Sequence, residues 1–257
     1  AALLIWHEIT EHREDTPVLI TQITKEPGSE LFVSPSPNGR FVAYKWTDST
    51  GQSNLYLKDT EQPELSPKQI TFDGATQGIS AWSPDGINLY FARNFEDKDQ
   101  CDIIQLNTLA QTESVVTSCP TSGGYYYLDM SPDGKTLAFH GKEKHEKNSG
   151  IYFINLDEKN ASATRFSCSG DCGYRDRDVA YSPDGEMLAI TRRLNRFNEN
   201  IFLVDFKTNQ EKQITFGEQD IVGITWHPDG DRLVFATQRA DVRQGFVFNL
   251  NDESTRE

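Results

Sequence analysis

The chain has 257 residues and a formal net charge of −14 at pH 7, from 25 Lys and Arg against 39 Asp and Glu. Such an acidic chain is a poor match to nucleic acid and to anionic membranes, so we expect this region to make no direct nucleic-acid contact. With 36% hydrophobic residues and no low-complexity linker, it can bury the core of one folded body.

The N-terminal segment, residues 1–16, opens with the apolar run Ala1–Trp6. This run is far shorter than the ~20 apolar residues that a membrane-spanning helix needs. Two interpretations stay open: a buried or fraying chain end, or the end of a membrane anchor with Trp6 and His7 at the interface. The rest of the chain, residues 17–257, is expected to form a single domain.

A short motif of the type Trp-Ser-Pro-Asp-Gly recurs along the chain, with its prolines 45 to 51 residues apart. Self-similarity at this period is typical of repeated supersecondary units. Asp-Gly or Asn-Gly between two apolar runs predicts a hairpin, here with a type I′ turn in which both residues have positive φ. The five copies are Pro35–Gly39, Trp82–Gly86, Met130–Gly134, Tyr181–Gly185 and Trp226–Gly230.

Each motif is followed by further strand-like runs, so that the unit contains four strands. Four antiparallel strands in roughly 40 to 50 residues form the blade of a β-propeller, which is the fold class we predict. The expected blades are Glu30–Phe72, Gly78–Ser118, Gly123–Ser167, Tyr174–Phe216 and Ile221–Leu250.

The fifth unit is expected to have only three strands of its own, because its third strand runs into Asn251-Asp252-Glu253-Ser254. Residues 17–24 end in the same Gln-Ile-Thr as residues 69–71 and 213–215, which belong to predicted fourth strands. We therefore expect this N-terminal strand to close the fifth blade and to remove two open sheet edges. The alternative is a fragment of a six- or seven-bladed propeller.

The Trp-Ser-Pro-Asp-Gly turns, the aromatic ends of the following strands and the Gln-Ile-Thr strands resemble the WD-like propeller repeats of the TolB family. The resemblance covers nearly the whole chain from about Glu30. It implies the fold rather than one function, since such blades occur in Pal-binding TolB, in peptidase propellers and in the extracytoplasmic parts of membrane-bound regulators. The α/β domain that precedes the propeller in TolB is not present in these residues.

The four cysteines lie where a propeller of this kind would pair them. Cys101 opens the third strand of the second blade and Cys119 closes its fourth, while Cys168 and Cys172 would close a tight loop. Three pairings are formally open, and a zinc site is the rival, although only one pair has close spacing. We expect the disulfides Cys101–Cys119 and Cys168–Cys172, which favour an oxidising, periplasmic compartment.

Candidate binding residues gather on the loop face, opposite the Ser-Pro-Asp-Gly turns. Tyr and Arg are frequent at binding hot spots, which favours a protein partner or a small ligand here. The alternative is that the tyrosines pack between blades and the Arg and Asp residues pair with each other at the surface. The candidates are Tyr125, Tyr126, Tyr174, Arg175, Asp176, Arg177, Arg192 and Arg193.

Other polar residues receive structural interpretations. His140 and His145 lie in a charged stretch that we expect to be a solvated loop. The Asp-Gly pairs are turn residues rather than ligands, and no EF-hand pattern is present, so no metal or cofactor is expected. The sequence contains no nucleophile elbow, zinc-protease motif or P-loop, which argues against an enzyme.

These features favour a non-catalytic extracytoplasmic sensor module. By resemblance, its context is a regulator of the CadC/ToxR type, tethered to the inner membrane of a Gram-negative bacterium, with a cytoplasmic winged-helix domain. One alternative is a free periplasmic protein-binding scaffold like TolB. Another is a propeller fragment of a hydrolase related to prolyl oligopeptidase.

Overall fold

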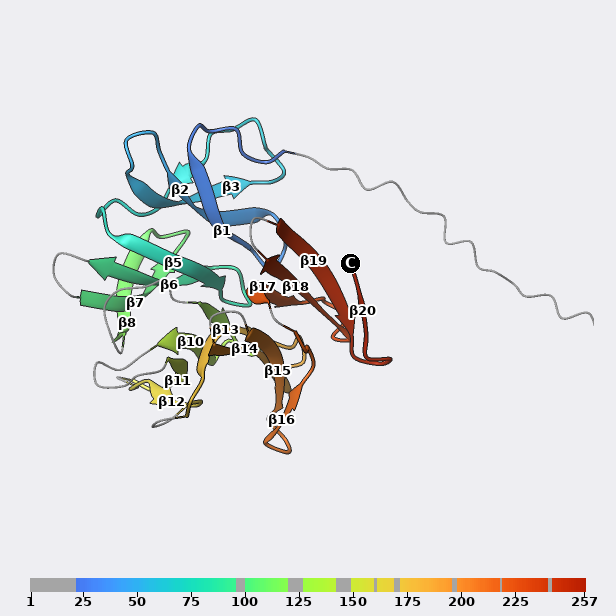
Figure 1. The fold of residues 1–257 in the computed structure, drawn as a ribbon. Coiled ribbons are helices and arrows are strands. Elements are labelled where there is room, and N and C mark those ends of the chain that lie inside the picture. Colours follow the sequence, from blue (N-terminus) through green and yellow to red (C-terminus); the bar gives the residue numbers. More distant parts are fainter. Residues whose placement is uncertain are drawn as a thin grey trace, which may run out of the picture.

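The computed structural model describes residues 22–95, 100–119, 127–141, 149–159, 161–168, 172–195, 198–217, 219–239 and 242–257. In this part of the chain the strands form five four-stranded antiparallel sheets around a central axis (Figure 1). None of the described residues forms a helix of the length and apolarity that crossing a membrane requires. The predicted all-β propeller of five blades is confirmed.

Each blade consists of four strands that follow one another in sequence, with the first strand innermost. The twenty strands are β1 (Ser29–Pro35), β2 (Phe41–Thr47), β3 (Ser53–Asp59), β4 (Lys68–Gln69), β5 (Thr76–Trp82), β6 (Asn88–Phe95), β7 (Gln100–Asn107), β8 (Thr112–Ser118), β9 (Leu128–Met130), β10 (Thr136–Gly141), β11 (Gly150–Asn155), β12 (Thr164–Arg165), β13 (Arg175–Tyr181), β14 (Met187–Asn195), β15 (Asn198–Asp205), β16 (Gln210–Gln213), β17 (Asp220–Trp226), β18 (Arg232–Arg239), β19 (Val242–Asn249) and β20 (Ser254–Arg256).

The predicted closure of the fifth blade by an N-terminal strand is wrong. Its fourth strand is β20, which pairs with β19 so that Ser254 lies opposite Asn249. The polar run that looked like an end is a tight turn, in which the Asp252 carboxylate accepts a hydrogen bond from the Ser254 amide. Residues 22–24 lie outside any strand, and residues 17–21 of the proposed N-terminal strand lie outside the described residues.

The repeated turn also differs from the predicted type I′ turn. Gly86 has a φ of 69°, but Asp85 is not among the described residues with positive φ. The Ser83 carbonyl accepts a hydrogen bond from the Gly86 amide at 2.8 Å, and the Asp85 carboxylate accepts one from the Ile87 amide at 2.9 Å. Pro84 favours a type I turn at this position, so the motif is a type I turn followed by a left-handed glycine.

One of these glycines also makes a close contact between repeats. A Cβ on Gly134, whose φ is 73°, would lie 3.2 Å from Cδ of Pro84 in the preceding turn, whereas a Cβ on Gly39 would meet nothing within 4 Å. We expect Gly134→Ala to cost about 1–2 kcal/mol from the left-handed backbone alone. It should cost more than Gly39→Ala when the two are compared by urea denaturation. Equal losses would show that the contact with Pro84 is irrelevant.

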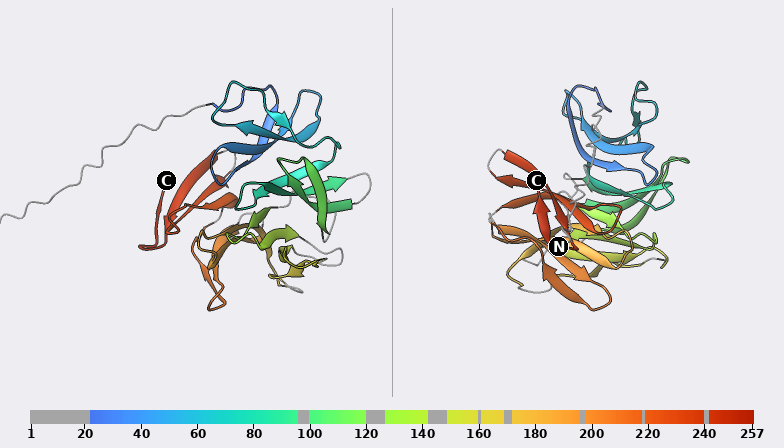
Figure 2. Two further views of the ribbon diagram at one scale, coloured as in Figure 1. Left: turned by 180° about the vertical axis from the view of Figure 1, so that it is seen from behind. Right: turned by 90° about the vertical axis from the view of Figure 1, so that its right-hand side faces the viewer.

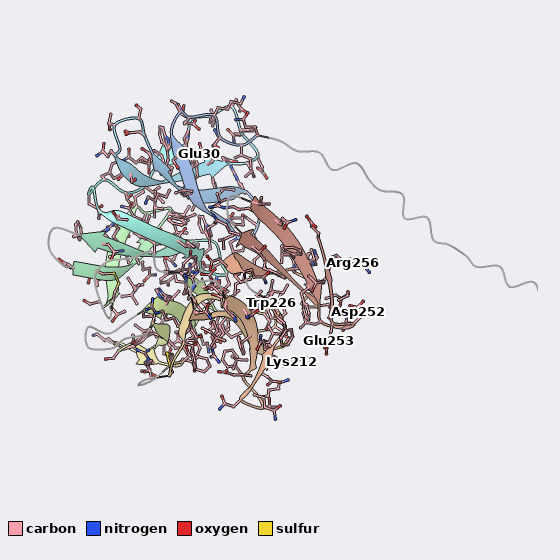
Figure 3. The ribbon with its side chains drawn as sticks, viewed as in Figure 1. Glu30, Lys212, Trp226, Asp252, Glu253 and Arg256 are labelled. Atoms are coloured by element: carbon pink, nitrogen blue, oxygen red, sulfur yellow. A yellow bond between two sulfur atoms is a disulfide. The ribbon has the colours of Figure 1, made fainter. Side chains whose placement is uncertain are left out.

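The tryptophans before two of the repeated turns, Trp82 and Trp226, join neighbouring blades. The Trp82 indole donates a hydrogen bond to the Ser34 carbonyl of the first blade, and the Trp226 indole donates one to the Ala180 carbonyl of the fourth, each at 3.0 Å. Lys212 of β16 in the fourth blade lies 2.7 Å from Glu253, in the turn before β20 of the fifth blade (Figure 3). These contacts fix the second blade against the first and the fifth blade against the fourth.

The hydrophobic core is divided among the blade interfaces. Four clusters of buried side chains join the first blade to the second, the second to the third, the third to the fourth and the fourth to the fifth. None of these four clusters joins the fifth blade to the first. Figure 2 shows the blue first blade and the red fifth blade on the two sides of that seam.

Residues beside the interface between the fifth and first blades are less buried than their counterparts in other blades. Ala189 of the fourth blade is fully buried, but Val234, the corresponding residue of the fifth blade, is only half-buried. On the inner strand of the first blade, Val33 is 63% exposed. Among the described residues, the packing is therefore tight at four interfaces between blades and more open between the fifth blade and the first.

Candidate functional site

Both predicted disulfides are present on the loop face. Cys101 and Cys119 join the start of β7 to the residue after β8, and Cys168 and Cys172 close the loop between β12 and β13. Disulfides of this kind persist in oxidising compartments. The pairing therefore points to an extracytoplasmic location.

The two bonds are expected to contribute unequally to stability. In the chain-entropy model the stabilisation grows with loop length, which gives about 3 kcal/mol for the Cys101–Cys119 loop and about 2 kcal/mol for the Cys168–Cys172 loop. Replacing each pair by alanines and measuring the free energy of unfolding in urea tests this order. A larger loss for the Cys168–Cys172 pair would contradict it.

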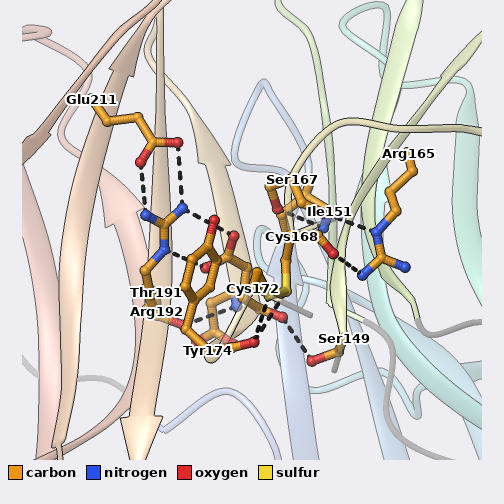
Figure 4. Close-up of polar contacts among 12 residues, drawn as sticks. Ser149, Ile151, Arg165, Ser167, Cys168, Cys172, Tyr174, Thr191, Arg192 and Glu211 are labelled. Atoms are coloured by element: carbon orange, nitrogen blue, oxygen red, sulfur yellow. Dashed lines mark hydrogen bonds and ion pairs between the residues drawn. A yellow bond between two sulfur atoms is a disulfide. The ribbon is translucent and has the colours of Figure 1, made fainter. Parts of the chain in front are cut away.

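A buried ion pair lies beside the smaller disulfide loop (Figure 4). The Arg192 guanidinium donates to the two carboxylate oxygens of Asp176 at 2.8 and 3.2 Å, and to those of Glu211 at 2.7 and 3.3 Å. The Asp176 side chain is fully buried, and that of Arg192 is 8% exposed. Burial raises the pKa of Asp176, although the hydrogen bonds from Arg192 act in the opposite direction. Arg192 and Asp176 therefore hold the blade together.

Aromatic rings complete the surroundings of this guanidinium. Its central carbon lies 4.0 Å from the ring centroid of Tyr174 and 4.6 Å from that of Phe202. The sulfur atoms of Cys168 and Cys172 each lie 3.1 Å from the Tyr174 carbonyl oxygen. Tyr174 is half-buried, and its ring and its carbonyl group both have close contacts. The next residue, Arg175, is exposed.

A second ionic cluster lies where β13, β14 and β15 meet β17. The Glu199 carboxylate, whose side chain is fully buried, lies 3.2 Å from Arg177 and 3.0 Å from Arg193. Arg193 also lies 2.9 Å from Asp220 of the fifth blade. The sequence also allows surface pairing of the Arg and Asp residues with each other, as an alternative to binding. Because Glu199 is buried, the ion pairs of these arginines are not confined to the surface.

The remaining candidates fall into two groups. Tyr125, Tyr126 and His145 lie outside the described residues. His140 lies in β10 opposite Ile151 and is half-buried, so its predicted place in a solvated loop is wrong. Burial, and then the charge of Arg177, lower the pKa of His140 to about 4, so that its ring is neutral at neutral pH.

A central cavity of about 490 Å³ lies between the inner strands of all five blades. Its lining includes Asp178, which sequence reasoning missed although it continues the Arg175-Asp176-Arg177 run. Glu199, Glu211 and Asp220, the partners of the arginines, were missed as well. Among the described residues no group of three or more His, Cys, Asp or Glu side chains is arranged to hold a metal ion.

No family model and no curated protein matches the chain. Among solved structures it is similar to TolB from Acinetobacter baumannii, with 20% identity, a TM-score of 0.74 and coverage of 91% of this chain and 55% of that one. A putative TolB from Agrobacterium tumefaciens gives the same identity and TM-score, with coverage of 91% and 82%. An oligogalacturonate lyase from Vibrio parahaemolyticus has 15% identity, a TM-score of 0.62 and coverage of 91% and 66%.

At these identities the likeness concerns the fold. The chain spans about half the length of the first TolB structure. One of the similar structures is named for an enzyme, so the fold by itself does not decide between binding and catalysis. The chain has a TolB-like β-propeller fold.

Proposed function

We propose that this propeller is a non-catalytic, extracytoplasmic module that binds a protein partner on its loop face. The observation that carries the proposal is a fixed tyrosine, Tyr174, next to an exposed arginine, Arg175. Tyr174 is fixed by the Arg192 guanidinium on one side and by the disulfide loop at its backbone, and Arg175 projects to solvent. Tyr and Arg are frequent at binding hot spots, and a tyrosine that is held in place before binding loses little conformational entropy when a partner docks.

The proposed setting is the periplasm of a Gram-negative bacterium, with the propeller as the sensory part of a membrane-tethered winged-helix regulator. Support comes from the two disulfides and from the resemblance of the repeats to those of such regulators. A free scaffold of the TolB type is the second candidate, favoured by the similarity of fold. A propeller from a hydrolase of the prolyl oligopeptidase type is the third.

Site-specific photocrosslinking tests the binding surface. A photoreactive residue placed at Arg175 should give a defined crosslinked product in periplasmic extracts, whereas one at Lys135 should not. Lys135 is an exposed cation on the turn side of the third blade and so is a matched control. Excess wild-type chain should compete the product away, and a chain carrying Tyr174→Ala and Arg175→Glu should not. Equal products from both positions, or equal competition, would overturn the proposal.

Osmotic shock of the natural host separates the two leading settings. A tethered sensor should stay with the membrane fraction, and a free scaffold should leave with the periplasmic fluid. Detection with an antibody against the folded propeller makes the distinction independent of any partner. Release of all of the protein into the periplasmic fluid would contradict the tethered sensor, but it would not contradict the proposed binding of a protein partner.

A further inference from the structure

A second pocket, of about 330 Å³, lies on the turn side of the propeller between the third and fourth blades. Its walls come from the repeated turns of these two blades and from the ends of their neighbouring strands. The lining residues used below are Pro132, Asp133, Phe153, Tyr181, Asp184 and Phe206. The pocket lies at the other end of β13 from Tyr174 and Arg175, so it does not rest on the proposed partner surface.

Phe206 is an exception among the repeats. In every blade the residue after the third strand donates its amide to a carbonyl of the repeated turn, as Phe206 does to Glu186 at 3.0 Å. The five residues at this position are Thr60, Thr108, Leu156, Phe206 and Leu250. An aromatic ring at this position is therefore particular to the fourth blade, and the repeat does not require it.

Phe153 is an exception of the same kind. It pairs with Ala138 in the register of β10 and β11. The residues at the corresponding position of the five third strands are Leu57, Gln105, Phe153, Leu203 and Val247. Only the third blade has an aromatic residue there. Two aromatic departures from the repeat thus face each other across one interface between blades.

The rings of Phe153, Tyr181 and Phe206 lie close together. The centroid of Phe206 is 6.1 Å from that of Phe153 and 6.0 Å from that of Tyr181, and the latter two are 6.4 Å apart. Phe206 is inclined at 65° to Phe153 and at 36° to Tyr181, so the rings do not form one flat stack. Phe206 is also 36% exposed. A single small cation in this pocket can therefore be attracted by more than one ring.

Two exposed carboxylates, Asp133 and Asp184, line the same pocket. Each accepts hydrogen bonds from the serine hydroxyl and from a backbone amide of its own turn, all on the same oxygen. The hydrogen bond from the serine is the main reason that the pKa of each carboxyl is lowered, so both are ionised at neutral pH. The second oxygen of each has no hydrogen-bond partner among the described residues.

Both carboxylates lie beside the rings. Burial, then Asp129 and then Asp133 raise the pKa of Tyr181, which places the charge of Asp133 within range of that ring. Asp184 accepts a hydrogen bond at 2.9 Å from the amide of Glu186, the residue whose carbonyl is bonded to the Phe206 amide. The two turns also touch, since a Cβ on Gly185 would lie 3.5 Å from Cδ of Pro132.

The nearby lysines do not neutralise this pocket. Lys135 and Lys207 are the cations that act on the two carboxylates. Lys135 is paired with Asp157 at 3.8 Å, and Lys207 with Glu186 at 2.5 Å. The pocket therefore combines aromatic walls with negative charge, which is complementary to a cation that has an apolar surface.

We propose that this pocket binds a quaternary ammonium group, with the rings of Phe153, Tyr181 and Phe206 around its methyl groups and the charges of Asp133 and Asp184 beside it. Such an ion has no N–H to donate, so aromatic faces and nearby negative charge are sufficient to hold it, and no acceptor has to point at it. The volume of about 330 Å³ lies within the usual range of small-ligand pockets.

Calorimetric titration with choline chloride at constant ionic strength tests the site. The uncharged match is 3,3-dimethyl-1-butanol, which has the same shape with carbon in place of nitrogen. We expect saturable binding of choline and at least tenfold weaker binding of the alcohol. Phe206→Leu introduces the residue that the third and fifth blades have at this position, and it should weaken choline binding at least fivefold. Phe72→Leu, at an exposed phenylalanine of the first blade, should leave binding unchanged.

The charge of the pocket is tested without disturbing its turns. Asn38 makes the same turn in the first repeat, where its side-chain oxygen accepts hydrogen bonds from the Ser36 hydroxyl at 2.8 Å and the Arg40 amide at 3.1 Å. The double replacement Asp133→Asn with Asp184→Asn should therefore fold normally and weaken choline binding at least tenfold. Asp85→Asn makes the same change in the turn of the second blade and should have no effect on binding.

Four outcomes would overturn the proposal. The first two are equal binding of choline and the alcohol, and unchanged choline binding by Phe206→Leu. The third is an equal effect of Asp85→Asn and of the double replacement. The fourth is tighter binding of argininamide than of choline, because it would assign the pocket to an arginine side chain of a protein partner.

Vesicles of phosphatidylcholine distinguish the two sources of a trimethylammonium group. Sedimentation of the protein with the vesicles, reversed by excess choline, would assign the pocket to a lipid headgroup. Binding of choline without sedimentation would assign it to a free small ligand. In either case Phe206→Leu should weaken the interaction, since the same rings receive the ion.

Discussion

Replacing Arg192 by Leu is expected to lower the free energy of unfolding by about 3–5 kcal/mol, the usual cost of removing one partner of a buried ion pair. The loss arises because Asp176, fully buried, would keep its carboxyl without the two hydrogen bonds at 2.8 and 3.2 Å. Loss of the pair with Glu211 should contribute less to this change, because the Glu211 side chain is 40% exposed and can be solvated. Urea denaturation followed by tryptophan fluorescence measures the change.

The matched control is Arg40→Leu, which removes an arginine from an exposed pair with Asp59. The Arg40 side chain is 43% exposed, so this change should cost less than about 1 kcal/mol. The double replacement Arg192→Leu with Asp176→Leu should recover part of the loss, because no buried carboxyl is left unpaired. A loss of similar size for Arg192→Leu and Arg40→Leu would show that burial of the ion pair does not matter.

Phe139→Ala is expected to cost about 3–5 kcal/mol, as large-to-small replacements in a packed core do. Phe139 is fully buried in the cluster shared by the second and third blades, and its ring stacks on that of Tyr152 with centroids 5.9 Å apart. The truncation would leave a cavity at an interface between blades, so both blades should be loosened together.

Phe72→Ala makes the same chemical change at a surface position. Phe72 is 74% exposed at the end of the first blade, and its loss should change the free energy of unfolding by less than about 1 kcal/mol. Native-state hydrogen exchange adds a second readout for Phe139→Ala, because protection should fall in both β6 and β10. Loss of protection in β10 alone would contradict a core that is shared between blades.

The blades could be predicted from the sequence because the signals that define them are local. Pro84 and Gly86 impose the turn through their own backbone preferences, and the same pattern recurs in the other repeats. Trp82 belongs to the same motif, and its indole donates a hydrogen bond to Ser34 of the preceding blade. A repeat that specifies both its turn and its contact with its neighbour predicts the whole ring.

The fourth strand of the fifth blade could not be predicted in the same way. The turn before Ser254 carries no proline or glycine, so the polar residues 251–253 resembled an end rather than a hairpin. In the structure Asp252 and a left-handed Glu253 form that turn through backbone hydrogen bonding and conformation that the composition does not reveal. The Gln-Ile-Thr of residues 22–24 matches the predicted fourth strands in sequence, but these residues do not form the fourth strand of the fifth blade.

The sequence predicts the two disulfides of the loop face but not the partners of its arginines. The Cys101–Cys119 pair follows from the antiparallel order of the strands, which the repeats determine, and the Cys168–Cys172 pair follows from the close spacing of these two residues. The ionic partners do not, because Glu211 lies 19 residues after Arg192 and Asp220 lies in the next blade. A bulge of one residue separates the surroundings of Asp176 from those of Asp178, and nothing in the alternation of Arg and Asp marks its position.

Peptide mapping of the cysteines in protein taken from its natural host tests the extracytoplasmic assignment most directly. Free thiols are alkylated at the moment of lysis, before air can oxidise them, and the digest is compared with and without reductant. The account predicts no alkylated cysteine before reduction and two linked peptide pairs, Cys101 with Cys119 and Cys168 with Cys172. Four alkylated cysteines would contradict it and would place the propeller in a reducing compartment.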